Sequence, residues 1–479
     1  MIKTDCSTAA IPTIQGVMVC MHQTHDFMPY MAPNPHYVTD IFLPAVAAAG
    51  LNTILIEYEA MYPWADEHTR LSCRDAWSRV ELADILTAAK HYGIEVIPLV
   101  QTLGHIYHIL LHPAYTALAE VPGMNQQLCP SNPATLKLAG ELLSDVMESH
   151  PDSRYLHLGG DECRLLGSCP VCQAKGTAAS YAEFYRKLTA FVLAHDRIPI
   201  LWHDIAVKRP ELLDTFDKRV MFHFWSYGDH CHGRLEEQYK VLSEHVGPER
   251  IIGGPAVRCD EAHGALLPSA PLIRDNIRRM DALVRREGMS GSILTDWPDS
   301  GMPFPLALPF LGYHGAMLDP AREVPCFDPS EDIFYGLAPF STGFQTQLVS
   351  YLDRFKFAPY DMVKALNNFP GVGARNVYFE LFHRKLALRE RLEAPFADPY
   401  RHLQYRTLDV FLALALAHLI PKQDHVPDPG MAAQFLAEYR RAEPELRAAY
   451  HVLYDPISYP GQVSRYLDML FKPCFMKVK

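Results

Sequence analysis

From Gln15 onward, short apolar segments alternate with longer segments whose apolar residues recur every three or four positions. The short segments predict buried strands, and the amphipathic segments predict helices. Eight strands are expected, at Gly16–His22, Asn52–Glu59, Glu95–Gln101, Tyr155–Gly160, Ile198–Asp204, Val220–Trp225, Arg250–Ala256 and Ser292–Trp297. Helices are expected between them, for example at Asp75–Tyr92, Ala134–Ser149, Tyr181–His195 and Ile273–Glu287.

Strands that alternate with helices indicate an α/β protein with a parallel sheet and right-handed crossovers. Eight such units over about 300 residues favour a closed (β/α)8 TIM barrel over an open doubly wound sheet. No Gly-rich phosphate-binding motif follows the first strand, which also disfavours a dinucleotide-binding fold. We therefore expect a lead-in at residues 1–14 and a barrel at 15–320.

The alternation ends after about residue 320, and the remaining pattern is mainly helical. Helices are expected at Arg375–Leu392, Tyr405–Ile420, Met431–Leu453 and Val463–Phe471. No low-complexity linker precedes them, so we expect residues 321–479 to form a C-terminal helical region that packs on the barrel. A homodimer surface and a lid are both open roles for this region.

The composition and charge indicate which partners and which cellular compartment to expect. A net charge of −11 and a pI near 6.1 argue against a nucleic-acid partner. The first 14 residues lack an apolar signal segment, and the most apolar run, Phe411 to Ile420, has about half the length that a membrane span needs. Eleven scattered cysteines suggest reduced thiols rather than a disulfide framework. We therefore expect a cytoplasmic protein with no membrane partner.

The fourth predicted strand ends in Gly159 and Gly160, and the adjacent acids Asp161 and Glu162 follow. In a barrel of this type, active sites lie at the carboxyl ends of the strands. Two neighbouring carboxylates there would acquire different pKa values through burial and mutual repulsion, which separates acid and base roles. The alternative is that both acids only cap the N-terminus of a helix.

Aromatic side chains gather at the other predicted strand ends. Four of the five tryptophans lie at or just beyond such ends: Trp64, Trp202, Trp225 and Trp297. Aromatic faces beside acids suit a sugar ring, whose C–H faces pack on them while its hydroxyls need polar partners. The alternative is that each tryptophan only fills the top of the barrel.

Three motifs resemble a known family. His157-Leu158-Gly159-Gly160-Asp161-Glu162 resembles the His-x-Gly-Gly-Asp-Glu signature of the family 20 β-N-acetylhexosaminidases. The segments 55–63 (LIEYEAMYP) and 95–105 (EVIPLVQTLGH) are similar to the intracellular hexosaminidase D branch. The motifs fall on three strand ends in the right order, and the resemblance covers roughly the barrel.

The resemblance implies an exo-acting retaining glycosidase that releases terminal β-linked N-acetylhexosamine from an oligosaccharide or glycoconjugate, without a cofactor. The acetamido oxygen of the substrate would attack the anomeric carbon and form an oxazolinium ion. Glu162 would act as general acid and then as base. Asp161 would orient the acetamide and stabilise positive charge on its nitrogen.

The resemblance also implies a set of substrate-binding residues. Tryptophans would wall the acetamide and the sugar face, aspartates would accept hydrogen bonds from hydroxyls, histidines would support the acid pair, and a tyrosine would donate to the acetamide oxygen. These residues are Trp202, Trp225, Trp297, Asp204, Asp299, His105, His157 and Tyr227, with Glu59 as a further candidate. His22 is a further substrate-binding candidate, because it stands where many members carry an arginine that binds sugar hydroxyls. The usual Tyr-x-Asp after the seventh strand is absent, so gluco or galacto preference stays open.

A Cys-x-x-Cys knuckle follows the acid pair. Cys169 and Cys172 form the knuckle, and Cys163 is the candidate third ligand of a structural zinc. Reduced thiols in a loop are the alternative interpretation. Two alternatives to the glycosidase also stay open: a metal-dependent barrel hydrolase using His22, His105, His203 and Asp296, and a non-catalytic sugar-binding barrel.

Overall fold

The computed structural model describes residues 11–21, 33, 35–73, 76–227, 231–258, 270–297, 308–325 and 430–454, with separate residues between 385 and 417. These residues divide into two compact units. The first unit comprises the described residues up to Ala256, with those in 276–296 and 308–325. The second comprises the described residues in 257–275, Trp297 and those beyond residue 326.

The first unit contains a closed parallel barrel. Neighbouring strands follow the chain order from β1 to β7 and then β9, and β9 pairs back with β1. The predicted (β/α)8 barrel is therefore confirmed. The strands are β1 (Ile14–Cys20), β2 (Thr53–Glu57), β3 (Glu95–Leu99), β4 (Tyr155–His157), β5 (Ile198–Trp202), β6 (Met221–Trp225), β7 (Ile251–Gly254), β8 (Ala256–Arg258) and β9 (Gly291–Asp296). Pro255 divides the seventh predicted strand into β7 and β8 because proline has no N–H to donate.

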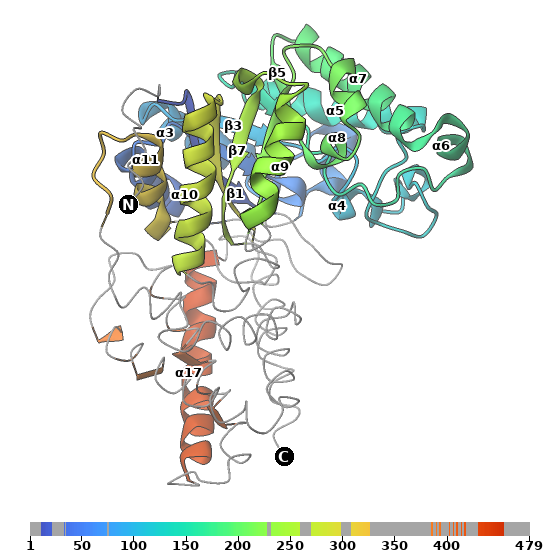
Figure 1. Ribbon diagram of the computed structural model, residues 1–479. Helices are drawn as coiled ribbons and strands as arrows, with labels where there is room; N and C mark the ends of the chain where they lie inside the picture. Colours follow the sequence, from blue (N-terminus) through green and yellow to red (C-terminus); the bar gives the residue numbers. More distant parts are fainter. Residues whose placement is uncertain are drawn as a thin grey trace. The chain divides into compact units, whose positions relative to one another are not determined.

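Helices surround the strands (Figure 1). They are α1 (Pro35–Tyr37), a π-helical turn (Val38–Phe42), α2 (Leu43–Ala48), α3 (Arg79–His91), α4 (Tyr107–Leu110), α5 (Pro133–Ser149), α6 (Pro170–Lys175), α7 (Thr177–Ala194), α8 (Asp204–Val207), α9 (Cys231–Ser243), α10 (Ala270–Glu287) and α11 (Leu308–Leu318). The four predicted barrel helices correspond to α3, α5, α7 and α10, with ends that differ by a few residues. The short helices between β1 and β2 were not among the predicted elements.

The barrel closes where β1 meets β9. Every residue of both strands is buried, as expected for a parallel sheet covered on both faces. Gly291 pairs with Ile14, and a Cβ atom on Gly291 would lie 2.1 Å from the Ile14 carbonyl oxygen. Only glycine therefore allows this close approach of the two backbones.

Local signals in the sequence set the helix starts. Ser78 and Glu81 form a reciprocal capping box at the start of α3. Asn132 accepts the Ala134 N–H before α5, with Pro133 in the first turn. These contacts satisfy backbone donors that the helices themselves leave unpaired.

A buried polar cluster connects α10, β9 and α11. Asp281 accepts a hydrogen bond from the Ser292 hydroxyl at 2.7 Å, and its other oxygen lies 2.7 Å from His314 Nδ1. The side chains of Asp281 and His314 are completely buried. Because both carboxylate oxygens have partners, the cluster specifies how these elements pack without leaving an unpaired acid.

The second unit contains α17 (Met431–Tyr454), close to the predicted helix Met431–Leu453. Lys385 is buried there and donates to Asp409 at 2.7 Å and to Glu438 at 2.6 Å. The other predicted C-terminal helices lie largely or wholly outside the described residues. The domain boundaries, the packing of this region on the barrel and the homodimer stay predictions. Within the described part of the chain, no helix has the length and apolar character to cross a membrane.

Candidate active site

The turn after β4 brings the acid pair to the end of the barrel. Gly159 and Gly160 have φ values of 66° and 96°, in the left-handed region that favours glycine. A Cβ on Gly159 would lie 1.9 Å from Gln101 Oε1, and one on Gly160 would lie 2.7 Å from the Tyr185 hydroxyl. Both glycines are therefore required for the backbone to pass these side chains and present the acids.

Three candidate residues have an unusual backbone conformation. Glu59, His105 and Glu162 have positive φ values of 46°, 53° and 45° and follow β2, β3 and β4. Such values are uncommon outside glycine and cost conformational energy. Residues of this kind cluster at functional sites, so their position at three successive strand ends supports a site at this end of the barrel.

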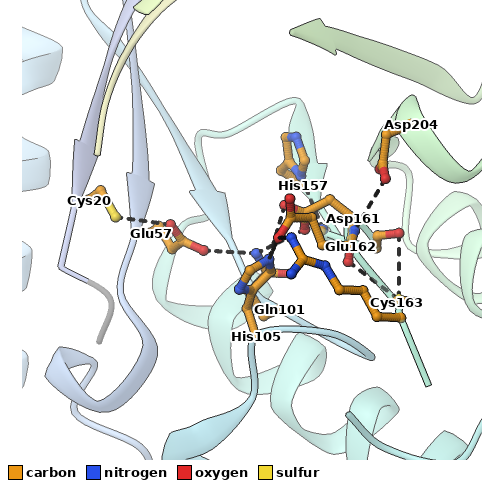
Figure 2. A network of polar contacts seen from close by, with 12 residues as sticks. Cys20, Glu57, Gln101, His105, His157, Asp161, Glu162, Cys163 and Asp204 are labelled. Atoms are coloured by element: carbon orange, nitrogen blue, oxygen red, sulfur yellow. Dashed lines mark hydrogen bonds and ion pairs between the residues drawn. The ribbon is translucent and has the colours of Figure 1, made fainter. Parts of the chain in front are cut away.

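One histidine nitrogen faces both acids (Figure 2). His105 Nε2 lies 3.4 Å from Asp161 Oδ2 and 3.7 Å from Glu162 Oε2. The Asp161 side chain is 10% exposed, whereas that of Glu162 is 36% exposed. The two adjacent acids therefore have different environments: Asp161 is enclosed by protein, and Glu162 is open to solvent.

The surroundings of Asp161 favour its ionised form. Burial by itself raises the pKa of this carboxyl, but the charge and hydrogen bond of His105 and the hydrogen bond from Gln101 outweigh it. The net effect lowers the pKa below its ordinary value. Asp161 is therefore an enclosed carboxylate that stays negative at neutral pH.

A chain of buried polar contacts leads from β1 to Asp161 (Figure 2). Cys20 Sγ donates to Glu57 at 3.1 Å, and the Gln101 amide donates to Glu57 at 2.9 Å and to Asp161 at 3.4 Å. Strands β1 to β4 are neighbours in the barrel, so their carboxyl ends meet. Glu57 and Gln101 were not predicted as site residues. Both lie at the ends of predicted strands, and this position is the sequence feature that could have identified them.

Asp204 approaches the acid pair from the end of β5. Its Oδ2 accepts the Glu162 backbone N–H at 3.3 Å, while its buried Oδ1 has no hydrogen-bond partner among the described residues. Burial and then the charge of Asp161 raise the pKa of Asp204 to about 6. Arg164, also missed by the sequence reasoning, donates to Glu162 Oε2 at 2.9 Å.

His157 and Trp202 lie in the barrel interior. Both are fully buried, and their ring centroids are 4.5 Å apart. Trp202 also stacks on His223 at 4.3 Å, so no face of its ring is exposed. Burial lowers the pKa of His157, which therefore stays neutral. Neither ring is open to solvent in this structure.

Trp225 and Tyr227 form an aromatic pair at the end of β6. Their rings stack at 5.2 Å with 20° between the planes, and both residues are half-buried. The Thr295 hydroxyl donates to the Tyr227 hydroxyl at 3.3 Å. The partly open pair has the aromatic face that a sugar ring needs.

The remaining candidates have individual positions or lie outside the described residues. Glu59 is buried, with Oε2 3.8 Å from His108 Nδ1. Trp297 belongs to the second unit. His22 and Asp299 lie outside the described residues. Cys163 hydrogen-bonds through Sγ to the Asp161 carbonyl oxygen at 3.4 Å and is not part of the group that contains Cys169 and Cys172.

The fold and the site together define a class: a parallel (β/α)8 barrel with paired carboxylates at its fourth strand end. Such a site has the groups that acid–base chemistry requires. Residues 54–245 match the family model described as glycosyl hydrolase family 20, catalytic domain. This segment carries Asp161 and Glu162, so the resemblance to family 20 is confirmed for the part of the chain that contains the acid pair.

Two curated relatives match part of the chain. Hexosaminidase D of Homo sapiens is 40% identical over 187 residues, which cover 37% of this chain and 38% of that protein. Hexosaminidase D of Bos taurus is 35% identical over 187 residues, 37% of this chain and 54% of that protein. The chain therefore spans about half or less of the length of these relatives.

Among solved structures, the chain is similar to the GH20 beta-N-acetylhexosaminidase from Streptomyces coelicolor A3(2). The TM-score is 0.47 at 16% sequence identity, over 64% of each chain.

Proposed function

We propose that this protein is an exo-acting β-N-acetylhexosaminidase that retains anomeric configuration through substrate-assisted catalysis. The observation that carries the proposal is the unequal acid pair. Asp161 is an enclosed carboxylate with a lowered pKa, and the adjacent Glu162 is open to solvent. A mechanism with an internal nucleophile needs this combination of one fixed negative charge and one accessible proton donor.

In the first step, the acetamido oxygen of the bound sugar attacks the anomeric carbon. The bond from that carbon to the leaving oxygen breaks, and Glu162 gives its proton to the leaving oxygen. Positive charge spreads over the resulting oxazolinium ring, and Asp161 accepts a hydrogen bond from its N–H. His105 and Gln101 hold Asp161 in position, so the negative charge is already oriented where positive charge develops.

In the second step, water attacks the anomeric carbon from the face that the leaving group vacated. Glu162, now a carboxylate, takes a proton from this water, and the ring opens to restore the acetamide. The two inversions leave the configuration retained. Because the nucleophile belongs to the substrate, the mechanism needs no nucleophilic side chain on the enzyme.

Nearby groups are suited to hold the sugar. Asp204 Oδ1 is buried without a hydrogen-bond partner in the described residues, which suits a substrate hydroxyl that donates to it. Trp225 and Tyr227 offer a partly exposed aromatic surface for a sugar face. Arg164 keeps Glu162 oriented in the absence of substrate.

A panel of aryl glycosides tests the reaction. Aryl N-acetyl-β-glucosaminide and N-acetyl-β-galactosaminide should be cleaved, and NMR should detect the β-anomer first. The plain aryl β-glucoside should be a poor substrate because it lacks the internal nucleophile. Efficient cleavage of the plain glucoside would refute the mechanism.

Two variants test the roles of the acids. Glu162→Gln should lower kcat by roughly 10²–10⁴-fold, the contribution typical of an acid–base group. Asp161→Asn should lower kcat more than it raises KM, because its interaction strengthens in the transition state. The matched controls, Glu148→Gln on α5 and Asp84→Asn on α3, change exposed side chains and should retain activity. Near-normal turnover of Glu162→Gln would remove the assignment.

A further inference from the structure

A second cluster of reactive side chains lies outside the contacts of the acid pair. Glu120, Cys129, Cys169 and Cys172 each offer one ligand-type atom, and these four atoms all lie within 4.8 Å of one another. Cys129, Cys172 and Glu120 are buried, and Cys169 is half-buried. The proposed hydrolytic mechanism uses none of these residues.

Two loops of the barrel build the cluster. Cys169 caps the start of α6, and Cys172 lies in the first turn of that helix. Glu120 and Cys129 each directly follow one residue of an antiparallel bridge between Ala119 and Leu128. Backbone hydrogen bonds fix this bridge, because the Glu120 N–H donates to the Gln127 carbonyl and the Cys129 N–H to the Leu118 carbonyl.

The sulfur separations match those of a metal site. Cys129 Sγ lies 3.6 Å from Cys169 Sγ and 3.8 Å from Cys172 Sγ. A disulfide would require about 2.05 Å. Four ligands around zinc with Zn–S bonds of about 2.3 Å form a tetrahedron whose edge is about 3.8 Å. Both separations therefore fit the edges of such a tetrahedron.

The fourth corner is a buried carboxylate. Glu120 is 1% exposed; its Oε1 accepts the Cys169 backbone N–H at 3.0 Å, and its Oε2 lies 3.4 Å from Cys172 Sγ. No lysine, arginine or histidine in the described part of the chain forms an ion pair with Glu120. An ionised carboxylate is costly to bury unless a partner compensates its charge, and a metal at this point would be such a partner.

We propose that Cys129, Cys169, Cys172 and Glu120 Oε2 bind a structural zinc ion. Three sulfur ligands select a soft ion such as zinc over magnesium or calcium. Four protein ligands fill the tetrahedral shell, which is typical of structural rather than catalytic zinc. The Cys172 N–H donates to Cys169 Sγ at 3.3 Å, and the Ser131 hydroxyl lies 3.1 Å from Cys172 Sγ, so outer contacts also orient the sulfurs.

This ligand set differs from the one expected from sequence. The knuckle of Cys169 and Cys172 is retained, but Cys129 and Glu120 replace Cys163 as its partners. The ion would tie the loop after β3 to the loop after β4, which also carries Glu162. The Leu165 N–H donates to Gln127 Oε1 at 2.8 Å between the same two loops. Zinc therefore serves to hold the loop that presents the acid pair.

Metal analysis of the full-length protein tests the proposal independently of any glycosidase activity. Protein produced in zinc-supplemented medium should contain stoichiometric zinc after gel filtration. Cys129→Ser and Cys169→Ser should lose most of it, and Glu120→Gln should lose zinc to a chelator at least about ten times more readily. Cys73→Ser changes a cysteine outside the cluster and should keep the wild-type zinc content.

A measurement on the unaltered chain covers the case in which a variant fails to fold. Wild-type protein stripped with a chelator and titrated with Co²⁺ should develop the intense absorption of tetrahedral cobalt and its thiolate charge-transfer band. Absence of zinc together with absence of these bands would overturn the proposal. Stoichiometric zinc that persists in both Cys129→Ser and Cys169→Ser would also overturn it, and iron in place of zinc would overturn the identity of the ion.

Discussion

Replacing Asp204 with Asn should stabilise the fold at neutral pH and have a smaller stabilising effect at pH 4. The Asp204 side chain is 6% exposed, and its Oδ2 accepts the Glu162 N–H and lies 3.4 Å from Lys208 Nζ. Burial, followed by repulsion from Asp161, raises its pKa from 3.8 to about 6. Ionisation of Asp204 is therefore harder in the folded chain than in the unfolded chain.

The direction of the pH effect follows from this difference. Well below pH 4, Asp204 is protonated in both the folded and the unfolded chain and makes no pH-dependent contribution to the free energy of unfolding. Between about pH 4 and pH 6, the folded chain holds a proton that the unfolded chain has lost, so stability falls as pH rises. Above about pH 6 the penalty is complete and constant. Asn cannot ionise, so the variant lacks this penalty at every pH.

The size of the effect can be worked out from the two pKa values. The difference between 6 and 3.8 is about 2.2, and one pKa unit corresponds to about 1.36 kcal/mol. The full penalty is therefore about 3 kcal/mol, and most of it, roughly 2 kcal/mol, should appear as a growing advantage of Asp204→Asn over wild type from pH 4 to pH 7. The Asn side-chain oxygen can still accept the Glu162 N–H, so the backbone contact survives.

Urea unfolding followed by tryptophan fluorescence measures this difference. Trp64, Trp77, Trp202 and Trp225 belong to the first unit, so the signal reports mainly on the barrel. Both proteins are unfolded at several pH values between 4 and 7, and the difference in unfolding free energy is compared. Taking a difference cancels the titration of groups that the substitution leaves unchanged.

The control is Asp84→Asn, which changes an exposed aspartate on α3 and should show no comparable pH-dependent gain. An advantage of Asp204→Asn that stays constant from pH 4 to pH 7, or that shrinks as pH rises, would contradict a raised pKa. The carboxyl would then be ionised at little cost, and its environment would be more polar than the burial of Asp204 implies.

Two further predictions concern the groups that hold the acid pair. Gly159→Ala should reduce activity by more than about 100-fold, because the added Cβ would displace the Gln101 amide and force a strained backbone. The control is Gly123→Ala, which also lies at positive φ but has open space around it and should remain active. His105→Ala should raise the pKa of Asp161, because it removes the opposing charge of the histidine. The value of kcat/KM should therefore fall more at pH 4–5 than at pH 7. A pH–rate profile whose acidic limb is unchanged would refute the role of His105 in lowering the pKa of Asp161.

The barrel itself was predictable from sequence because its signals are local. Buried parallel strands read as apolar segments, and each predicted strand corresponds to one in the structure apart from the division at Pro255. The short helices between β1 and β2 were missed because segments of three to six residues show too little periodicity. The acid pair was also found, since two glycines and two acids at a strand end form a local motif.

The side-chain contacts around the acid pair were harder to predict from the sequence. Gln101 lies between Glu57 and Asp161 only because β2, β3 and β4 are neighbours with their carboxyl ends aligned. Likewise, the sequence did not show that Trp202 is fully buried and stacks on His223. Whether a residue at a strand end faces inward or outward depends on the register of its strand, and a strand buried on both faces has no alternation of apolar and polar residues that would reveal it.

By itself, then, the sequence determined the order of strands, the closed barrel they imply and the position of Asp161 and Glu162 at the fourth strand end. The tertiary structure alone decided how those acids differ, because the pKa of Asp161 depends on side chains brought from other strands. It also decided that Cys129 and Glu120 join Cys169 and Cys172. The physical reason is that electrostatic and ligand interactions depend on separations of a few ångströms between residues that are distant along the chain.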